Sequence, residues 1–375
     1  MEYMNKEKID EANEFNYFRV GTIFNPIQTD LIPEIRMIGI TIDYPVRLNA
    51  MAIDPSRIAA DYKMMYSPGE IVFSTKLSIQ VTVKLLEENV IRIEGEDSKN
   101  APVIKHVCMI MAKAFGYTGG FEVVVNRCHE YRHCGLGSTG GLQSAVAACI
   151  NEIFSKPFRK ENLVKYLARN YGEEIDHEDE YLNPVQCIGG SAANGFYDGG
   201  VLVLAGHNTV IATGIISDDY DVLIGVPNDY IPSDSESQFN EEKQCLDLFA
   251  NCGNVYGQKI AYNVLHYFLP ALVNQDVSVM GDVIYDYRYN MGSNENCSYT
   301  YKNLVPLLNN LAYLKKEGIT DVLSISSVGP AVFAIVKLEN SDQCRKAFEK
   351  ENLSILETKI NNNSYHIVKE YVDEL

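Results

Sequence analysis

Alternating apolar and polar positions dominate the first third of the chain. A period of two is typical of strands that bury one face. The alternating stretches are residues 37–54, 71–86 and 90–96, and a shorter strand pattern occupies 121–131. Between them, residues 101–117 carry the pattern of a helix, which we expect to end at Gly119 and Gly120. The order predicts a sheet packed against helices.

A glycine-rich turn at 134–141 separates the strand pattern at 121–131 from a helix pattern. The helix is indicated by apolar residues that recur on one face. They are Leu142, Ala145, Val146, Cys149, Ile150 and Ile153. A second helix is expected at Lys160–Arg169, and residues 173–180 (EEIDHEDE) are predicted to be an acidic surface stretch.

The second half of the chain mixes strand and helix patterns without regular alternation. A glycine-rich segment at 188–200 leads into a strand at 201–206, and another strand and turn follow at 221–232. Helices are expected at Ser237–Phe249, Tyr256–Leu269 and Tyr301–Lys316, and a strand–turn–strand or strand–turn–helix unit at 322–336. This order predicts an α+β protein.

A chain of 375 residues is long enough for two lobes. We expect a peripheral arm at 1–35, an N-terminal lobe at 36–204 and a C-terminal lobe at 205–375. The nine cysteines are scattered without C-x-x-C spacing, which favours reduced thiols over a disulfide framework or a zinc site.

The net charge of −18 argues against partners that are nucleic acids or anionic membranes, because phosphates are repelled at long range. The first thirty residues contain no apolar signal segment, and no run of eighteen apolar residues occurs. We therefore expect a cytoplasmic protein without a membrane span. A small phosphorylated ligand in a local basic pocket remains compatible with this charge.

The turn at 134–141 is the strongest local signal for chemistry. Its glycines allow positive φ and a close backbone approach, and the following helix N-terminus offers unpaired N–H groups to an anion. Ser138 and Thr139 add hydroxyl donors. The turn lacks the lysine of a Walker loop and the spacing of a dinucleotide site. A phosphate-binding loop and a merely tight turn both fit this pattern.

Local charge favours the phosphate interpretation. Residues 105–169 contain nine Lys and Arg and four Glu, a local charge of +5. Arg132 and His133 directly precede the turn and are the preferred ligand contacts there. A second turn of small residues carries Ser326, Ser327 and Gly329, which could bring backbone and hydroxyl groups near an anion; a buried β-turn in which Pro330 fixes φ is the alternative.

Three segments resemble the motifs of the GHMP kinase superfamily. Residues 132–148 (RHCGLGSTGGLQSAVAA) resemble its second motif, 326–335 its C-terminal glycine-rich motif, and 45–54 (PVRLNAMAID) its opening segment. The resemblance implies a GHMP-kinase-like two-lobed fold, with a ribosomal-S5-like N-lobe, a ferredoxin-like C-lobe and the ligand cleft between them.

One branch of that superfamily is more similar, the β-ribofuranosylaminobenzene 5′-phosphate (β-RFAP) synthases and related C-ribosyltransferases. The matching segments are 133–138, 187–200, 269–276 (LPALVNQD) and 326–332. The branch implies a transferase that uses phosphoribosyl diphosphate (PRPP) with Mg²⁺. It joins ribose 5-phosphate to an aromatic or heterocyclic carboxylate and releases CO2 and diphosphate. The family also implies a homodimer.

The kinase alternative can be tested against the sequence. Many kinases of the superfamily place a catalytic Asp seven residues before the Gly-Gly pair that closes the second glycine-rich segment. Here that position is Ala192. This absence disfavours an ATP-dependent small-molecule kinase, which stays as the second hypothesis. A catalytically silent ligand-binding homologue is the third.

The resemblance assigns roles to individual residues. Asp54 is the preferred catalytic carboxylate together with Arg47, and a turn role for Asp54 before Pro55 is the alternative. The expected phosphate-binding residues are Arg132, His133, Gly135, Gly137, Ser138, Thr139 and Gly140. The expected substrate-binding residues are Asn49, Lys63, Ser191, Asn194, Ser326, Ser327 and Gly329. Asn49 and Val328 stand where the branch has His and Trp, so a changed aromatic subsite is plausible.

Overall fold

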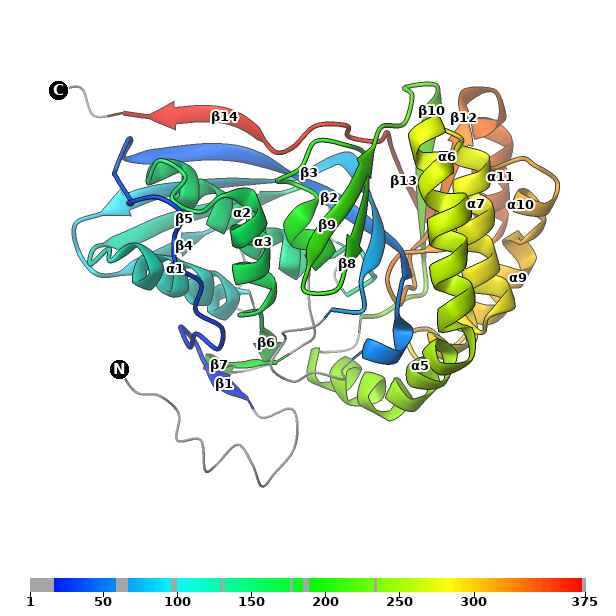
Figure 1. The fold of residues 1–375 in the computed structure, drawn as a ribbon, viewed down its shortest axis with the longest axis horizontal. Coiled ribbons are helices and arrows are strands. Elements are labelled where there is room, and N and C mark those ends of the chain that lie inside the picture. The colour runs from blue at the N-terminus through cyan, green and yellow to red at the C-terminus, as the bar shows by residue number, and fades with distance from the viewer. Residues whose placement is uncertain are drawn as a thin grey trace.

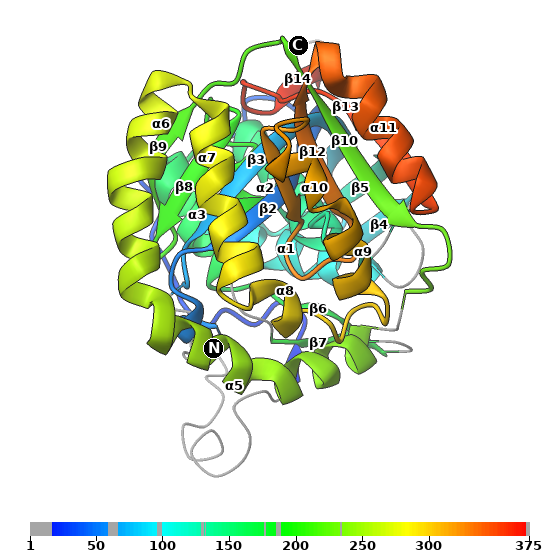
Figure 2. The ribbon, with the colours of Figure 1, turned by 90° about the vertical axis from the view of Figure 1, so that its right-hand side faces the viewer.

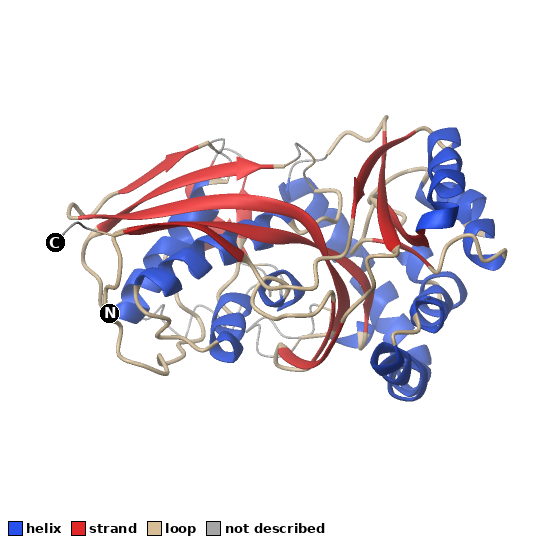
Figure 3. Cartoon of the chain, turned by 90° about the horizontal axis from the view of Figure 1, so that it is seen from above, coloured by secondary structure: helices blue, strands red, loops and turns tan. Residues whose placement is uncertain are grey.

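Two lobes lie side by side in the computed structural model of the protein (Figure 1). The structure describes residues 17–58, 67–95, 100–128, 131, 133–175, 178–184, 189–232 and 235–372. The larger lobe is built on a long curved sheet, and the smaller lobe carries helices over a short sheet (Figures 1 and 3). The architecture is the α+β fold that the sequence predicts.

The strands of the larger lobe confirm the alternating pattern. Within the described residues the sheet has seven strands in the order β14-β2-β3-β5-β4, with β8 beside β3 and β9 beside β8. The first four strands of this sheet in chain order are β2 (Gly39–Ala52), β3 (Glu70–Leu86), β4 (Ile91–Glu94) and β5 (Gly120–Arg127). The pairing of β2 with β3 shifts register between Pro45 and Arg47 and again between Asn49 and Met51. Such irregularities turn side chains out of the regular alternation.

Three helices cover one face of this sheet (Figure 1). They are α1 (Ala101–Phe115), α2 (Ser138–Ile153) and α3 (Lys160–Ala168). Helix α1 ends at Gly116, which has φ +66°, and not at Gly119 and Gly120 as predicted. Gly120 instead opens β5, where a Cβ would overlap the carbonyl oxygen of Val90. Position 120 therefore needs a glycine because the chain packs closely against Val90 there, and not because a helix ends there.

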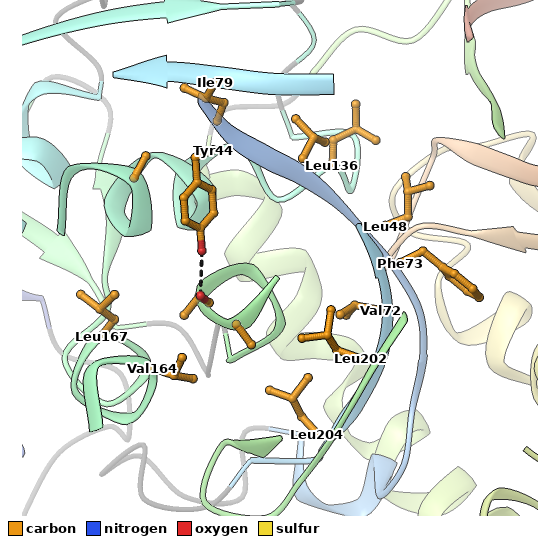
Figure 4. Packing of buried hydrophobic residues seen from close by; sticks show 14 of the residues in the cluster. Tyr44, Leu48, Val72, Phe73, Ile79, Leu136, Val164, Leu167, Leu202 and Leu204 are labelled. Carbon is orange, nitrogen blue, oxygen red and sulfur yellow. Dashed lines mark hydrogen bonds between the residues drawn. The ribbon is translucent and has the colours of Figure 1, made fainter. Parts of the chain in front are cut away.

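The core between sheet and helices includes one polar anchor, Tyr44. Its ring is fully buried among aliphatic residues of β2, β3, β8 and α3 (Figure 4). Its hydroxyl donates to the carbonyl oxygens of Ser191 at 2.9 Å and Ala192 at 2.7 Å. These bonds fasten the short helix α4 (Gly189–Ala193) to the middle of the sheet.

The acidic segment predicted to lie on the surface is buried at Glu174 and Ile175 and exposed at Asp179 and Glu180, so the prediction was wrong only for its first part. It forms β6 (Glu173–Ile175) and β7 (Glu178–Asn183), which join β1 (Phe18–Arg19) in a three-stranded sheet. Glu174 is only 2% exposed. Phe18 is buried in the same region, so the described part of the expected arm packs on the larger lobe. The pairing of Phe18 with Leu182 spans far too much sequence for local periodicity to show it.

The smaller lobe contains a four-stranded antiparallel sheet of the order β11-β12-β10-β13. Its strands are β10 (Tyr220–Pro227), β11 (Val322–Ile325), β12 (Val332–Lys337) and β13 (Leu353–Thr358). The segment 322–336 is therefore strand–turn–strand, one of its two expected forms. The helices gathered around this sheet in Figure 2 include α7 (Val277–Tyr285), α8 (Ser293–Asn296), α9 (Leu304–Leu311), α10 (Tyr313–Lys316) and α11 (Ser341–Lys350).

The two helices expected at 237–249 and 256–269 are one continuous element. Helix α5 (Ser235–Asn263) passes through a π-helical turn, η3 (Val264–Phe268), into α6 (Leu269–Asn274). Gly253, near the expected gap, does not break the helix, because it lies where α5 meets the 3-10 turn η2 (Pro55–Arg57) and a Cβ there would overlap Ser56. The lack of a side chain at Gly253 lets α5 pack closely against η2.

The long sheet takes strands from both sides of the predicted boundary between residues 204 and 205. Strands β8 (Val201–Ala205) and β9 (Thr209–Gly214) pair with each other, and β14 (His366–Tyr371) pairs with β2 (Figures 1 and 3). Within the described residues, none of the helices is both long enough and apolar enough to cross a lipid bilayer.

Candidate functional site

The glycine-rich turn lies between β5 and α2, as the sequence predicts. Gly135 and Gly137 have φ values of +93° and +65°, a region that favours glycine. A Cβ on Gly135 would overlap the carbonyl oxygen of Ser326. Helix α2 begins at Ser138, and its N-cap residue, Gly137, has no side chain that could cap the first turn. The turn therefore presents the positive end of a sixteen-residue helix.

Arg47 joins this turn to α4. It follows the register shift in β2 and is buried, with 9% of its surface exposed. Its Nε donates to Ser191 Oγ at 2.9 Å, and its Nη1 donates to the carbonyl oxygen of Gly135 at 3.2 Å. The guanidinium therefore lies directly beside the backbone of the glycine-rich turn.

The turn of small residues between β11 and β12 closes on the same place from the other lobe. Ser326 Oγ donates to the carbonyl oxygen of Gly135 at 2.7 Å and accepts from the N–H of Asn49 at 3.1 Å. The N–H of Ser327 donates to the carbonyl oxygen of Asn49 at 2.8 Å. We call the residues that these contacts unite the loop cluster: Arg47, Asn49, Gly135, Gly137, Ser191, Ser326 and Ser327.

The other expected ligand residues lie around the loop cluster in different settings. Ser138 is half-buried on the first turn of α2, and Thr139 and Gly140 are buried there. Gly329 has φ +90° in the turn that carries Ser326. Asn194 is fully buried and donates to the carbonyl oxygen of Pro45 at 2.8 Å. These contacts make Asn194 a brace between α4 and β2.

Asp54 stands outside the loop cluster. Its Oδ1 accepts from Ser56 Oγ at 2.5 Å, and its Oδ2 lies 3.8 Å from Arg57 Nε. These contacts fix the start of η2, in agreement with the turn role that the sequence left open. The catalytic role of Asp54 stays a prediction. Two further expected residues, Lys63 and Arg132, lie outside the described residues.

His133 borders the turn and faces a buried acid. Its φ is +49°, and its carbonyl oxygen accepts from the Tyr230 hydroxyl at 2.6 Å. Its Nε2 lies 3.4 Å from Glu174 Oε1. Sequence reasoning missed Glu174 because the segment around it is acidic; the apolar Ile175 directly after it was the available signal.

Glu70 is a second acid that sequence reasoning missed. It is the first residue of β3 and is buried, with 7% exposed. Its Oε1 accepts from the N–H of Gly190 at 2.7 Å, and its Oε2 accepts from Asn49 Nδ2 at 2.5 Å. Burial raises the pKa of this carboxyl, while the charge of Arg47 and the Gly190 hydrogen bond oppose the rise. The site therefore combines a cationic and an acidic side.

The described residues of the site favour neither a thiol nucleophile nor a metal ion held by protein ligands alone. Burial raises the pKa of Cys134 to about 12, which keeps its thiol protonated near neutral pH. Within the described residues, no group of three or more His, Cys, Asp and Glu side chains could hold a metal ion. Mg²⁺ commonly binds through substrate phosphates and water with few protein ligands. The residues present therefore fit Mg²⁺ only as a partner of a phosphorylated substrate.

No protein-family model matches the chain, and a search of curated proteins also finds no match. Solved structures do match over nearly the whole chain. Homoserine kinase from Cytophaga hutchinsonii has a TM-score of 0.57 at 14% identity, over 89% of this chain and 98% of its own. Mevalonate diphosphate decarboxylase from Enterococcus faecalis has 0.58 at 12%, over 88% and 99%. Mevalonate kinase from Methanococcus jannaschii has 0.56 at 12%, over 85% and 98%.

These similarities show that the chain shares the fold of a homoserine kinase, a mevalonate kinase and a mevalonate diphosphate decarboxylase, in agreement with the two-lobed fold that the sequence resemblance implies. At such low identity they carry the fold alone.

Proposed function

We propose that the protein is a PRPP-dependent, decarboxylating C-ribosyltransferase. It joins ribose 5-phosphate to an aromatic or heterocyclic carboxylate and releases CO2 and diphosphate. The observation that carries the proposal is the loop cluster, in which Arg47 and the turn with Ser326 meet the glycine-rich turn at the N-terminus of α2. That arrangement suits a diphosphate.

The proposed chemistry places a growing negative charge at the loop cluster. As the C1–O bond of the ribose breaks, its electron pair leaves with the diphosphate. A carbon of the aromatic ring then attacks C1, and the ring's carboxylate departs as CO2 while its bonding electrons restore aromaticity. Helix α2 and Arg47 would stabilise the leaving group. Mg²⁺, bound through the diphosphate, would neutralise part of its charge.

The surroundings of Ala192 support a reaction without a base at that position. Ala192 is fully buried, and its carbonyl oxygen accepts from the Tyr44 hydroxyl. A decarboxylating ring substitution loses CO2 where other ring substitutions lose a proton. A transferase of the proposed kind can therefore work without the carboxylate that a kinase of this fold would need there.

An ATP-dependent small-molecule kinase is the second candidate, and Glu70 is the observation that favours it. Its carboxylate bonds to Gly190, two residues before Ala192 on the same helix. A carboxylate supplied from β3 could replace the missing Asp as the base that accepts the proton of a substrate hydroxyl. Two of the similar structures are kinases, and the Enterococcus faecalis decarboxylase is described with an ATP-binding mechanism.

The proposal also includes a homodimer and a cytoplasmic location, both of which rest on the family resemblance and the composition. We also keep the division into lobes at 36–204 and 205–375 as a proposal, although β9 and β14 of the second range join the sheet of the larger lobe. None of these three carries the argument for the reaction, which depends on the loop cluster.

The decisive experiment measures diphosphate release from PRPP and Mg²⁺ over a panel of aromatic and heterocyclic carboxylates. ATP with common alcohols runs in parallel. Acceptor-dependent release from PRPP supports the transferase and identifies the acceptor. Turnover with ATP alone overturns it in favour of the kinase, and then Glu70→Gln should abolish turnover while ATP still binds. Tight diphosphate binding without turnover in either assay would favour a catalytically silent homologue.

A further inference from the structure

A buried arginine from the smaller lobe lies behind the loop cluster. Arg288 stands in a second π-helical turn, η4 (Asp286–Asn290), and is only 3% exposed. Its Nε donates to the carbonyl oxygen of Ala50 at 2.8 Å and to Ser324 Oγ at 3.1 Å. Its Nη1 donates to Ser293 Oγ at 3.2 Å. All of these acceptors are uncharged.

The second terminal nitrogen of Arg288 reaches the backbone of the loop cluster. Nη2 donates to the carbonyl oxygens of Ser327 at 3.0 Å, Ile325 at 3.2 Å and Asn49 at 3.4 Å. Ser327 and Asn49 are themselves members of the cluster and bond to each other through the Ser327 N–H. One side chain therefore fixes the turn of the smaller lobe against β2 of the larger lobe.

The buried guanidinium of Arg288 carries a permanent positive charge. Within the described ranges, no carboxylate lies at ion-pair distance from it. Among the described residues, the groups on which its charge acts include Cys252, Cys297, Tyr287 and Tyr289, which are neutral near pH 7. Burying an unpaired charge costs free energy, and the cost is largest where nothing anionic is near. An acidic chain of net charge −18 offers many carboxylates, yet none of those in the described ranges forms an ion pair with Arg288.

We propose that Arg288 is a positioning residue whose counter-ion is the phosphate-bearing ligand of the loop cluster. It holds the carbonyls of Asn49 and Ser327, so that the Ser326 side faces the ligand, and it places a fixed positive charge behind that face. The ligand's charge then offsets the cost of the buried guanidinium. The identification of the ligand as a diphosphate rests on the proposed function.

The test measures binding of inorganic diphosphate to the full chain by titration calorimetry, together with circular dichroism and thermal unfolding without ligand. The variants are Arg288→Gln, which removes the charge, and Arg288→Lys, which keeps the charge but loses the fork of donors. Arg345→Gln is the matched control. Arg345 of α11 forms an ion pair with Glu357 of β13. The Arg345→Gln variant therefore changes the net charge by the same amount without touching the loop cluster.

We expect Arg288→Gln to weaken diphosphate binding roughly tenfold or more, and Arg288→Lys to retain affinity within about threefold. Arg345→Gln should bind like the unmodified chain. Equal affinity in folded Arg288→Gln overturns the proposal. An equal loss of diphosphate affinity in both Arg288 variants also overturns the proposal. That result is expected if only the hydrogen bonds of the guanidinium matter and its charge does not. If Arg288→Gln does not fold, an Arg288→Lys variant that folds but has lost affinity overturns it. Absence of diphosphate binding in the unmodified chain would refute the proposed function itself.

Discussion

Replacing Glu242 by Gln should stabilise the protein above neutral pH and leave its stability near pH 4 unchanged. Glu242 lies on α5 with a half-buried side chain, and Glu173 of β6 acts on it. Burial, followed by the negative charge of Glu173, raises the pKa of Glu242 from 4.5 to about 7. A raised folded-state pKa stabilises the fold below the unfolded pKa, and this contribution is lost as the pH rises through the folded pKa.

The magnitude follows from the size of the shift. A rise from 4.5 to about 7 corresponds to about 3 kcal/mol between pH 4 and pH 8, since one pKa unit is about 1.4 kcal/mol. The side chain keeps some contact with solvent, so we expect about 2 kcal/mol in practice. The amide of Gln cannot ionise. The variant should therefore gain this amount at pH 8 and almost none at pH 4.

The assay is urea unfolding of both proteins at pH 4, 6, 7 and 8, followed by circular dichroism. Glu241→Gln is the matched control, because Glu241 is the preceding residue on α5 and is exposed. It should change the free energy of unfolding by less than about 0.5 kcal/mol at every pH. A Glu242→Gln variant whose gain is the same at pH 4 and pH 8 would refute the reasoning, because that gain could not come from ionisation.

Three further substitutions test the site itself. Ser138→Ala should weaken diphosphate binding about tenfold in calorimetry, since a hydrogen bond to a charged group contributes about 1.5 kcal/mol, and unchanged affinity would remove Ser138 from the site. Asp54→Asn should abolish turnover in the PRPP assay without changing the circular dichroism spectrum; unchanged kinetics would leave Asp54 only its contacts in η2. Gly135→Ala should lower stability by roughly 2 kcal/mol or more in urea unfolding and weaken diphosphate binding, because φ is +93° and a Cβ would overlap Ser326. A fully stable Gly135→Ala would contradict the described turn.

The sequence predicts most of what local periodicity controls. The alternation at 37–54 and 71–86 marks β2 and β3, and the apolar stripe from Leu142 marks α2. The glycine-rich turn falls where expected because strand, turn and helix are consecutive in the chain. The meeting of Ser326 with Gly135 follows from the family resemblance and not from any local pattern.

The residues that sequence reasoning missed depend on contacts between distant segments. Glu174 is buried in a sheet where β6 pairs with β7, and β7 pairs on its other side with β1 from the start of the described chain. Glu70 looks like an ordinary polar residue before an apolar run, and only α4 gives it a partner. Arg288 lies in a mixed polar and aromatic stretch, DYRYN, and its acceptors come from β2 and β11. Local patterns carry no information about such partners.

The place of β14 has a consequence for biosynthesis. This strand covers the edge of β2, yet it is translated roughly 300 residues later, which takes on the order of tens of seconds at typical ribosome speeds. Throughout that interval the N–H and C=O groups along that edge of β2 have no strand partner. An open edge of this kind invites pairing with a neighbouring nascent chain. Chaperone dependence during synthesis should therefore concentrate on this edge and end when β14 leaves the ribosome.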